Sequence, residues 1–111
     1  MAEIILMTTP LPQEYRIVKN FGIVTGVTCR TRGVGGKFIA GFESMIGGEV
    51  TAFTSEMEKA RFQAIDRMKE KALALGANAV AGVDIETSEV YQGIVLISAT
   101  GTALQIAERA K

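Results

Sequence analysis

The sequence has no histidine and no tryptophan, and it holds one cysteine and two prolines in 111 residues. Without histidine, the chain cannot form a Ser-His or Cys-His catalytic pair and has no imidazole base near neutral pH. One thiol cannot form a disulfide within the chain, which favours a reducing compartment. A structural zinc site uses four thiolate or imidazole ligands, and one copy of the chain offers only Cys29. The sequence therefore lacks the usual parts of nucleophilic catalysis and of a soft-metal site.

Net charge and long apolar runs are missing as well. Twelve basic and twelve acidic residues cancel, so there is no electrostatic case for nucleic acid or an anionic membrane as partner. The apolar run Ile4 to Met7 lacks a basic flank and is too short for a secretory signal, and no stretch reaches the roughly 18 apolar residues of a membrane span. We therefore expect a cytoplasmic protein.

What is present fits one domain over residues 1–111. An apolar content of 48% with no net charge exceeds what the surface of a monomer usually needs, which predicts a homo-oligomer. The segment 73–85 organises the chain, because a helix ends there and a strand begins. Gly76 stands where a left-handed residue closes a helix, and Asn78 is expected to bond its own backbone in the turn.

A long helix is predicted over residues 49–75, although Ser55 and Glu58 form a capping box from which the regular helix could start instead. Apolar residues three or four apart form one stripe that should face a sheet, namely Phe53, Met57, Ala60, Ala64, Met68, Ala72 and Leu75. Phe62 and Leu73 lie on nearly the opposite side. They are read as isolated exposed residues, with contact to a neighbouring subunit as the alternative.

Strands are predicted at Tyr15 to Thr28, Ala79 to Val90 and Ile94 to Ile106, and the last two form a hairpin. The run Glu3 to Thr9 should be an edge or accessory strand, because prolines follow it. Residues 92–107 contain no charge, which favours a central place for the third strand. The fold class is therefore α+β, a β-α-β-β unit with an antiparallel sheet of order 1-3-2, the helix on one face and the other face needing a cover. Alternation along the first strand puts Tyr15, Ile17, Phe21 and Ile23 on one face.

The glycine-rich segment 33–48 is read as a loop followed by a short helix over 37–46. It matches neither a phosphate-binding loop nor the dinucleotide-binding pattern, so it predicts no cofactor.

Candidate ligand residues are few. Arg61 lies close to the apolar stripe of the helix. Its aliphatic chain is expected to pack on the stripe while its guanidinium stays in water. The alternative is that the guanidinium bonds an anion or carboxylate at a subunit boundary. Asp84 and Glu86 share one strand face and could bind a hard cation, although solvated carboxylates are commoner. Cys29 is expected to be a small buried apolar residue, with thiolate binding of metal as the alternative. Catalytic residues are not predicted.

Several pieces occur together in order, namely Thr8-Thr9-Pro10, Phe21-Gly22-Ile23-Val24-Thr25-Gly26, Gly47-Gly48, Ala60-Arg61, Gly76-Ala77-Asn78-Ala79-Val80-Ala81-Gly82-Val83 and Gly101-Thr102-Ala103. Together they resemble the YbjQ family, small bacterial and archaeal proteins that carry a heavy-metal-binding label without an established function. The resemblance implies a dodecin-like subunit and a ring of identical subunits, expected to be a homopentamer, with extra short strands joining the subunits. The run Glu3 to Thr9 is then a candidate intersubunit strand. The segment 29–36 departs from the family pattern, so no role is carried over to it.

The first function hypothesis is a ring-forming binding or scaffold protein that holds a ligand at subunit boundaries. The alternative is a heavy-metal-binding protein, and the second alternative is an enzyme with an intersubunit site built from Arg61, Asp84 or Glu86. The residues that matter most should be structural, namely Gly22, Gly26, Gly76, Asn78, Gly82 and Gly101.

Overall fold

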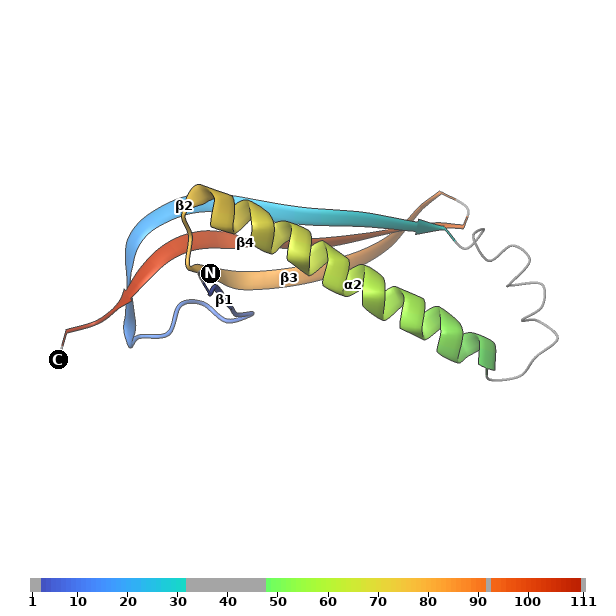
Figure 1. The fold of residues 1–111 in the computed structure, drawn as a ribbon, viewed down its shortest axis with the longest axis horizontal. Helices are drawn as coiled ribbons and strands as arrows, with labels where there is room; N and C mark the ends of the chain where they lie inside the picture. The colour runs from blue at the N-terminus through green and yellow to red at the C-terminus, as the bar shows by residue number, and fades with distance from the viewer. Residues whose placement is uncertain (1–2, 32–47, 92, 111) are drawn as a thin grey trace.

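The computed structural model describes residues 3–31, 48–91 and 93–110, and the helix expected over 37–46 lies outside these ranges. The chain forms β1 (Ile5–Leu6), β2 (Tyr15–Thr31), α2 (Gly48–Leu75), β3 (Ala79–Tyr91) and β4 (Ile94–Glu108). The strands make one sheet of order β1-β3-β4-β2, and α2 crosses one face of it (Figure 1). The α+β class and the long helix are confirmed. No helix among the described residues is long and apolar enough to cross a membrane.

The sheet is mixed and has four strands. The strand β4 runs antiparallel to both of its neighbours, β2 and β3, and β1 joins the other side of β3 in parallel. The two antiparallel pairings expected for the three-strand sheet are present, whereas the parallel pairing of β1 with β3 was not part of that prediction. The hairpin turn is tight, since Tyr91 pairs with Ile94.

The N-terminal segment pairs within its own chain. The amides of Ile5 and Met7 donate to the carbonyls of Asn78 and Val80, and the amide of Gly82 donates to the carbonyl of Thr9. The expectation of an edge strand at residues 3–9 is confirmed. Within one copy of the chain these bonds join the segment to Asn78 and β3, and a role for it between subunits stays a prediction.

Two irregularities in β2 overturn the predicted alternation of its side chains. The register with β4 shifts between Ile17 and Lys19 and again between Asn20 and Gly22, which leaves one extra residue in each gap. Each extra residue reverses the face of the residues that follow. Phe21 therefore packs against the core under α2, away from the face that Ile23 shares with its β4 partner.

The core lies between α2 and the sheet, and the helical stripe predicted its centre. Four stripe residues, Ala60, Ala64, Met68 and Ala72, are fully buried against side chains of all three long strands, and Met57 is partly buried. The stripe ends before Leu75, which is exposed. The helix begins at Gly48, so the capping box does not mark its start.

The junction after the helix has the geometry that the sequence indicated. Gly76 has φ of +97°, its amide donates to the carbonyl of Leu73, and the amide of Ala77 donates to the carbonyl of Ala72. These two bonds form a Schellman motif, which satisfies the last carbonyls of the helix.

Asn78 bonds a neighbouring strand and not its own backbone. Its side-chain Nδ2 donates to the carbonyl of Ile106 (3.0 Å), and its Oδ1 accepts from the amide of Ile106 (2.8 Å). Its main chain bonds Leu104 and Ile5. Asn78 therefore connects β1, β3 and β4 at the position between the end of α2 and the start of β3.

Candidate functional site

The side chains of the described strands form an exposed surface on the sheet face that turns away from α2. Residues that pair across strands share a face, so the register defines this surface. It comprises Ile23, Thr25, Val27 and Cys29 of β2, Leu96, Ser98, Thr100 and Thr102 of β4, and Asp84, Glu86 and Ser88 of β3. We call this set the open sheet face.

One end of this side of the sheet is covered. Ala79, Ala81, Leu104 and Ile106 are buried beneath the partly buried side chains of Met7 and Leu11 from the N-terminal segment and of Tyr15 at the start of β2. The sequence predicted a bare face that needs a cover, and the structure supplies it over this end only. The open sheet face lies between this second cluster and the hairpin turn.

Hydroxyl groups run along the middle of the open sheet face. The Oγ1 atoms of Thr25 and Thr100 lie 3.5 Å apart across β2 and β4, and Ser98 and Thr102 stand on either side of Thr100 in β4. Apolar residues occupy the β2 side of this row, where Ile23 is 78% exposed. Carboxylates occupy the β3 side. Across the open sheet face, the side chains are therefore mainly apolar on β2, mainly hydroxyl-bearing on β4 and mainly acidic on β3.

The structure places the predicted site residues in two groups. Asp84 and Glu86 share the open sheet face and are both exposed, as their spacing indicated. Arg61 is exposed on α2, which packs on the other face of the sheet. One copy of the chain therefore does not bring Arg61 together with the two carboxylates.

Cys29 is exposed, and the prediction of a buried thiol was wrong. It pairs with Leu96 on the open sheet face, while the neighbouring Thr28 faces the helix and is buried. The described residues contain no group of three or more His, Cys, Asp and Glu side chains that could hold a metal ion.

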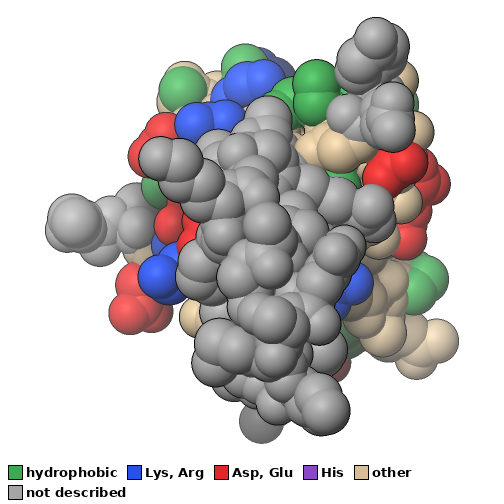
Figure 2. Space-filling model, turned by 90° about the vertical axis from the view of Figure 1, so that its right-hand side faces the viewer, with side chains coloured by type: hydrophobic (Ala, Val, Ile, Leu, Met, Phe, Trp, Pro, Cys, Tyr) green, Lys and Arg blue, Asp and Glu red, His purple; other side chains and the backbone are tan. Residues whose placement is uncertain are grey.

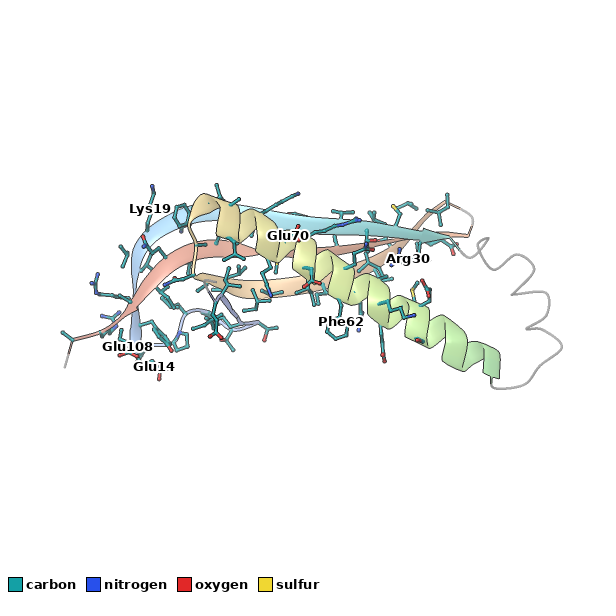
Figure 3. All side chains as sticks on the ribbon, viewed as in Figure 1. Glu14, Lys19, Arg30, Phe62, Glu70 and Glu108 are labelled. Atoms are coloured by element: carbon teal, nitrogen blue, oxygen red, sulfur yellow. The ribbon has the colours of Figure 1, made fainter. Side chains whose placement is uncertain are left out.

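Polar contacts between α2 and β2 were missed by the sequence analysis. The hydroxyl of Thr28 donates to Oε1 of Gln63 (2.7 Å), and Nη1 of Arg67 donates to the backbone carbonyl of Val27 (2.6 Å). Arg30 Nε lies 3.6 Å from Glu56 Oε1. Figure 3 shows Lys19 and Arg30 toward opposite ends of β2. These contacts fix the helix above β2, but their partners are 35 or 40 residues apart for the first two, so spacing alone could not identify them.

Charged side chains of both signs belong to the described surface that is visible at the hairpin end of the molecule (Figure 2). Figure 2 shows Lys and Arg side chains beside Asp and Glu side chains, with neither sign gathered into one broad patch on the visible described residues.

Comparison with known proteins gives a consistent family. The YbjQ family model, described as "Putative heavy-metal-binding", matches residues 4–107. A UPF0145 protein of Sulfurisphaera tokodaii is 43% identical over 95% of this chain and 92% of its own length. A UPF0145 protein of Saccharolobus islandicus is 40% identical over 96% and 94%, and one from Bradyrhizobium is 40% identical over 92% of each chain.

A solved structure supports the fold. A protein of unknown function from Pediococcus pentosaceus, assigned to the DUF74 family, superposes with a TM-score of 0.63 over 94% of this chain and 98% of its own. Its sequence identity is 15%, so the likeness concerns the fold alone.

Proposed function

The chain belongs to the YbjQ family, and from this premise we propose that it is a self-assembling binding or scaffold protein. Copies form a ring, with the dodecin-like pentamer as the expected form, and a ligand or partner is held where subunits meet. The observation that carries this proposal is the exposed apolar surface of β2.

Apolar side chains gather on one edge strand. Eight large apolar residues are exposed among those described, and four of them lie on β2, namely Ile17, Val18, Ile23 and Val27. The strand spans 17 residues at the edge of the sheet. Long apolar edge strands are templates for pairing with another chain, and monomeric proteins usually shorten, charge or cover them. Another copy of the same chain can cover this strand without any further protein.

Native mass spectrometry of gently purified protein tests the assembly, and Ile23→Lys identifies the surface. We expect a discrete multiple of the subunit mass for the wild type and mainly monomers for Ile23→Lys. Phe62→Lys is the matched control, since Phe62 is also apolar and 66% exposed but lies on α2. It should assemble like the wild type. A monomeric wild type would overturn the proposal, and loss of assembly by Phe62→Lys alone would move the contact to α2.

Heavy-metal binding is the second candidate function, and the printed description of the family favours it. The chain offers few soft ligands, since it has one cysteine and no histidine. A thiolate site would have to use symmetry copies of Cys29, which is exposed. Protein purified without added metal or chelator should show excess mass per ring if metal is retained. Loss of that mass in Cys29→Ser would establish the thiolate site, and its retention would exclude that ligand.

A further inference from the structure

The sheet has an open edge along part of β3. Near its start, β3 is bonded on its outer side, where the amide of Val83 donates to the carbonyl of Met7. Beyond Val83, from Asp84 to Ser88, no described strand lies beside β3 on this side. We call the outer side of residues 84–88 the open β3 edge. An unpaired edge strand is a template for a further extended chain.

The direction of the backbone groups along the open β3 edge follows from Val83. Its amide points outward, because it donates to Met7 in the segment beyond β3. Val83 and Ile85 both pack against the core under α2, so the alternation of the strand is regular between them. Backbone groups of a strand point to the same side at every second residue. The amides and carbonyls of Ile85 and Thr87 therefore point outward, where no described strand pairs with them.

The side chains at the open β3 edge are apolar on one face and acidic on the other. On the side of α2, Val83 and Ile85 lie at the margin of the core and are only partly buried. On the open sheet face, Asp84 and Glu86 are exposed, and no salt bridge joins them to another described residue. Arg61 does not offset these carboxylates, because it lies on the α2 side of the sheet.

The helix extends past the outer side of β3. In Figure 1, α2 runs obliquely across the sheet, and its N-terminal half passes beyond β3. Figure 3 shows Phe62 on the side of α2 that points away from β2. Phe62 is 66% exposed. A chain that lies along the open β3 edge would therefore have apolar side chains of β3 and α2 on its helix-facing side.

We propose that the open β3 edge binds an extended segment of another protein in which basic and apolar residues alternate. Such a segment adds a strand to the sheet and bonds the backbone of Ile85 and Thr87. Side chains of a strand alternate between its faces, so the basic residues of the segment meet Asp84 and Glu86, and its apolar residues lie on the side of α2. This binding site goes beyond the proposed function, because ring formation does not require it.

Charge complementarity selects this segment and this edge. Neighbouring strands lie about 4.8 Å apart, which is less than the Debye length of about 8 Å at physiological salt, so basic residues of the segment attract Asp84 and Glu86. An acidic segment is repelled by the same carboxylates. The other outer strand of the sheet offers no such match, since every charged residue of β2 is basic, namely Arg16, Lys19 and Arg30.

Fluorescence anisotropy with labelled peptides tests the chemistry of the partner. The probe is a fluorescein-labelled peptide of about eight residues in which lysine alternates with valine. We expect saturable binding of this peptide, and a dissociation constant about tenfold higher or more for a peptide in which glutamate alternates with valine. A peptide of the first composition with its lysines grouped at one end should also bind more weakly, because its charges cannot all lie on one face. Equal binding of all the peptides, or no binding of the first, would overturn the inference.

Two sets of variants locate the binding site. Thr87→Pro removes an outward amide but leaves the bonds to β4, so it should abolish binding, whereas Thr87→Ala keeps the amide and should bind like the wild type. Asp84→Lys with Glu86→Lys should raise the dissociation constant by about tenfold or more. Asp66→Lys with Glu70→Lys is its matched control, since both residues are exposed on α2, and should change nothing. Circular dichroism checks folding, and wild-type binding by either folded edge variant would overturn the inference.

Native mass spectrometry separates this inference from the proposed function. Wild-type assemblies should keep their subunit number and gain the mass of the bound lysine-valine peptide. If the peptide binds only as copies dissociate, a second copy of the chain occupies the edge and the inference is overturned. Absence of peptide binding would leave self-assembly standing. A monomeric wild type that binds the peptide would refute the proposed function alone.

Discussion

Asn78 shows how much geometry one residue can fix. It follows the Schellman motif at the end of α2. Its side-chain amide bonds both the amide and the carbonyl of Ile106, as the main chain of a neighbouring strand residue would. The sequence indicated a turn at Asn78, because asparagine favours turns. The partner could not be predicted, since Ile106 lies 28 residues away and is brought alongside by the pairing of β3 with β4.

We predict that Asn78→Ala lowers the free energy of unfolding by about 1–3 kcal/mol, because it leaves the amide and carbonyl of Ile106 without these partners. Urea denaturation measures the change. Asn20→Ala is the control, since Asn20 makes one side-chain bond, to the amide of Gly22, at an exposed site. It should cost clearly less. Equal losses of unfolding free energy in the two variants would show that the bonds to Ile106 stabilise the fold no more than the exposed bond of Asn20 does.

At the scale of elements, the contact between α2 and β2 is set by a glycine. A Cβ built on Gly26 would lie 2.1 Å from the carbonyl oxygen of Ala64 and 2.3 Å from the amide nitrogen of Met68. Both atoms belong to the helix backbone, so no side chain can turn aside. The sequence analysis named Gly26 as a structural residue, and the close approach of the α2 backbone is the reason.

Gly26→Ala should therefore separate helix and strand and destabilise the fold by about 1–3 kcal/mol, as overpacked cores do. Gly101→Ala is the comparison, because the nearest atom to its added Cβ is Cγ1 of Val80, which belongs to a side chain. We expect the larger fall in melting temperature for Gly26→Ala. The reverse order would mean that α2 shifts more easily than a valine rotates.

Elements were predictable from sequence where periodicity was long and regular. The apolar stripe of the helix predicted four buried residues, namely Ala60, Ala64, Met68 and Ala72. The uncharged run 92–107 corresponds to β4, an interior strand of the sheet. Prediction failed in β2 because extra residues interrupt a period of two, and no residue type marks where an interruption falls. It failed for Cys29 because burial there depends on which face the helix covers.

The candidate site was less accessible to sequence reasoning than the fold. Asp84 and Glu86 were identified because alternate residues of a strand share a face. Their relation to Arg61 could not be deduced, since it depends on the face on which α2 packs.

For the whole molecule, assembly through the apolar surface of β2 should withstand salt. We predict that raising ionic strength from about 0.01 M to 1 M, where the Debye length falls from about 30 Å to 3 Å, does not weaken assembly of the wild type. Light scattering at fixed protein concentration measures this. Assembly that weakens with salt would indicate that charges and not apolar contacts hold the copies together.

In a closed ring of the kind proposed, each copy is held twice, once by each of its two neighbours. Release of one copy then requires both contacts to open together, although neither needs to be strong. Rings mixed from isotopically light and heavy protein should consequently exchange their copies far more slowly than two chains joined by a single such contact would part. Persistence of the assembly would thus arise from closure of the circle, with each individual contact remaining modest.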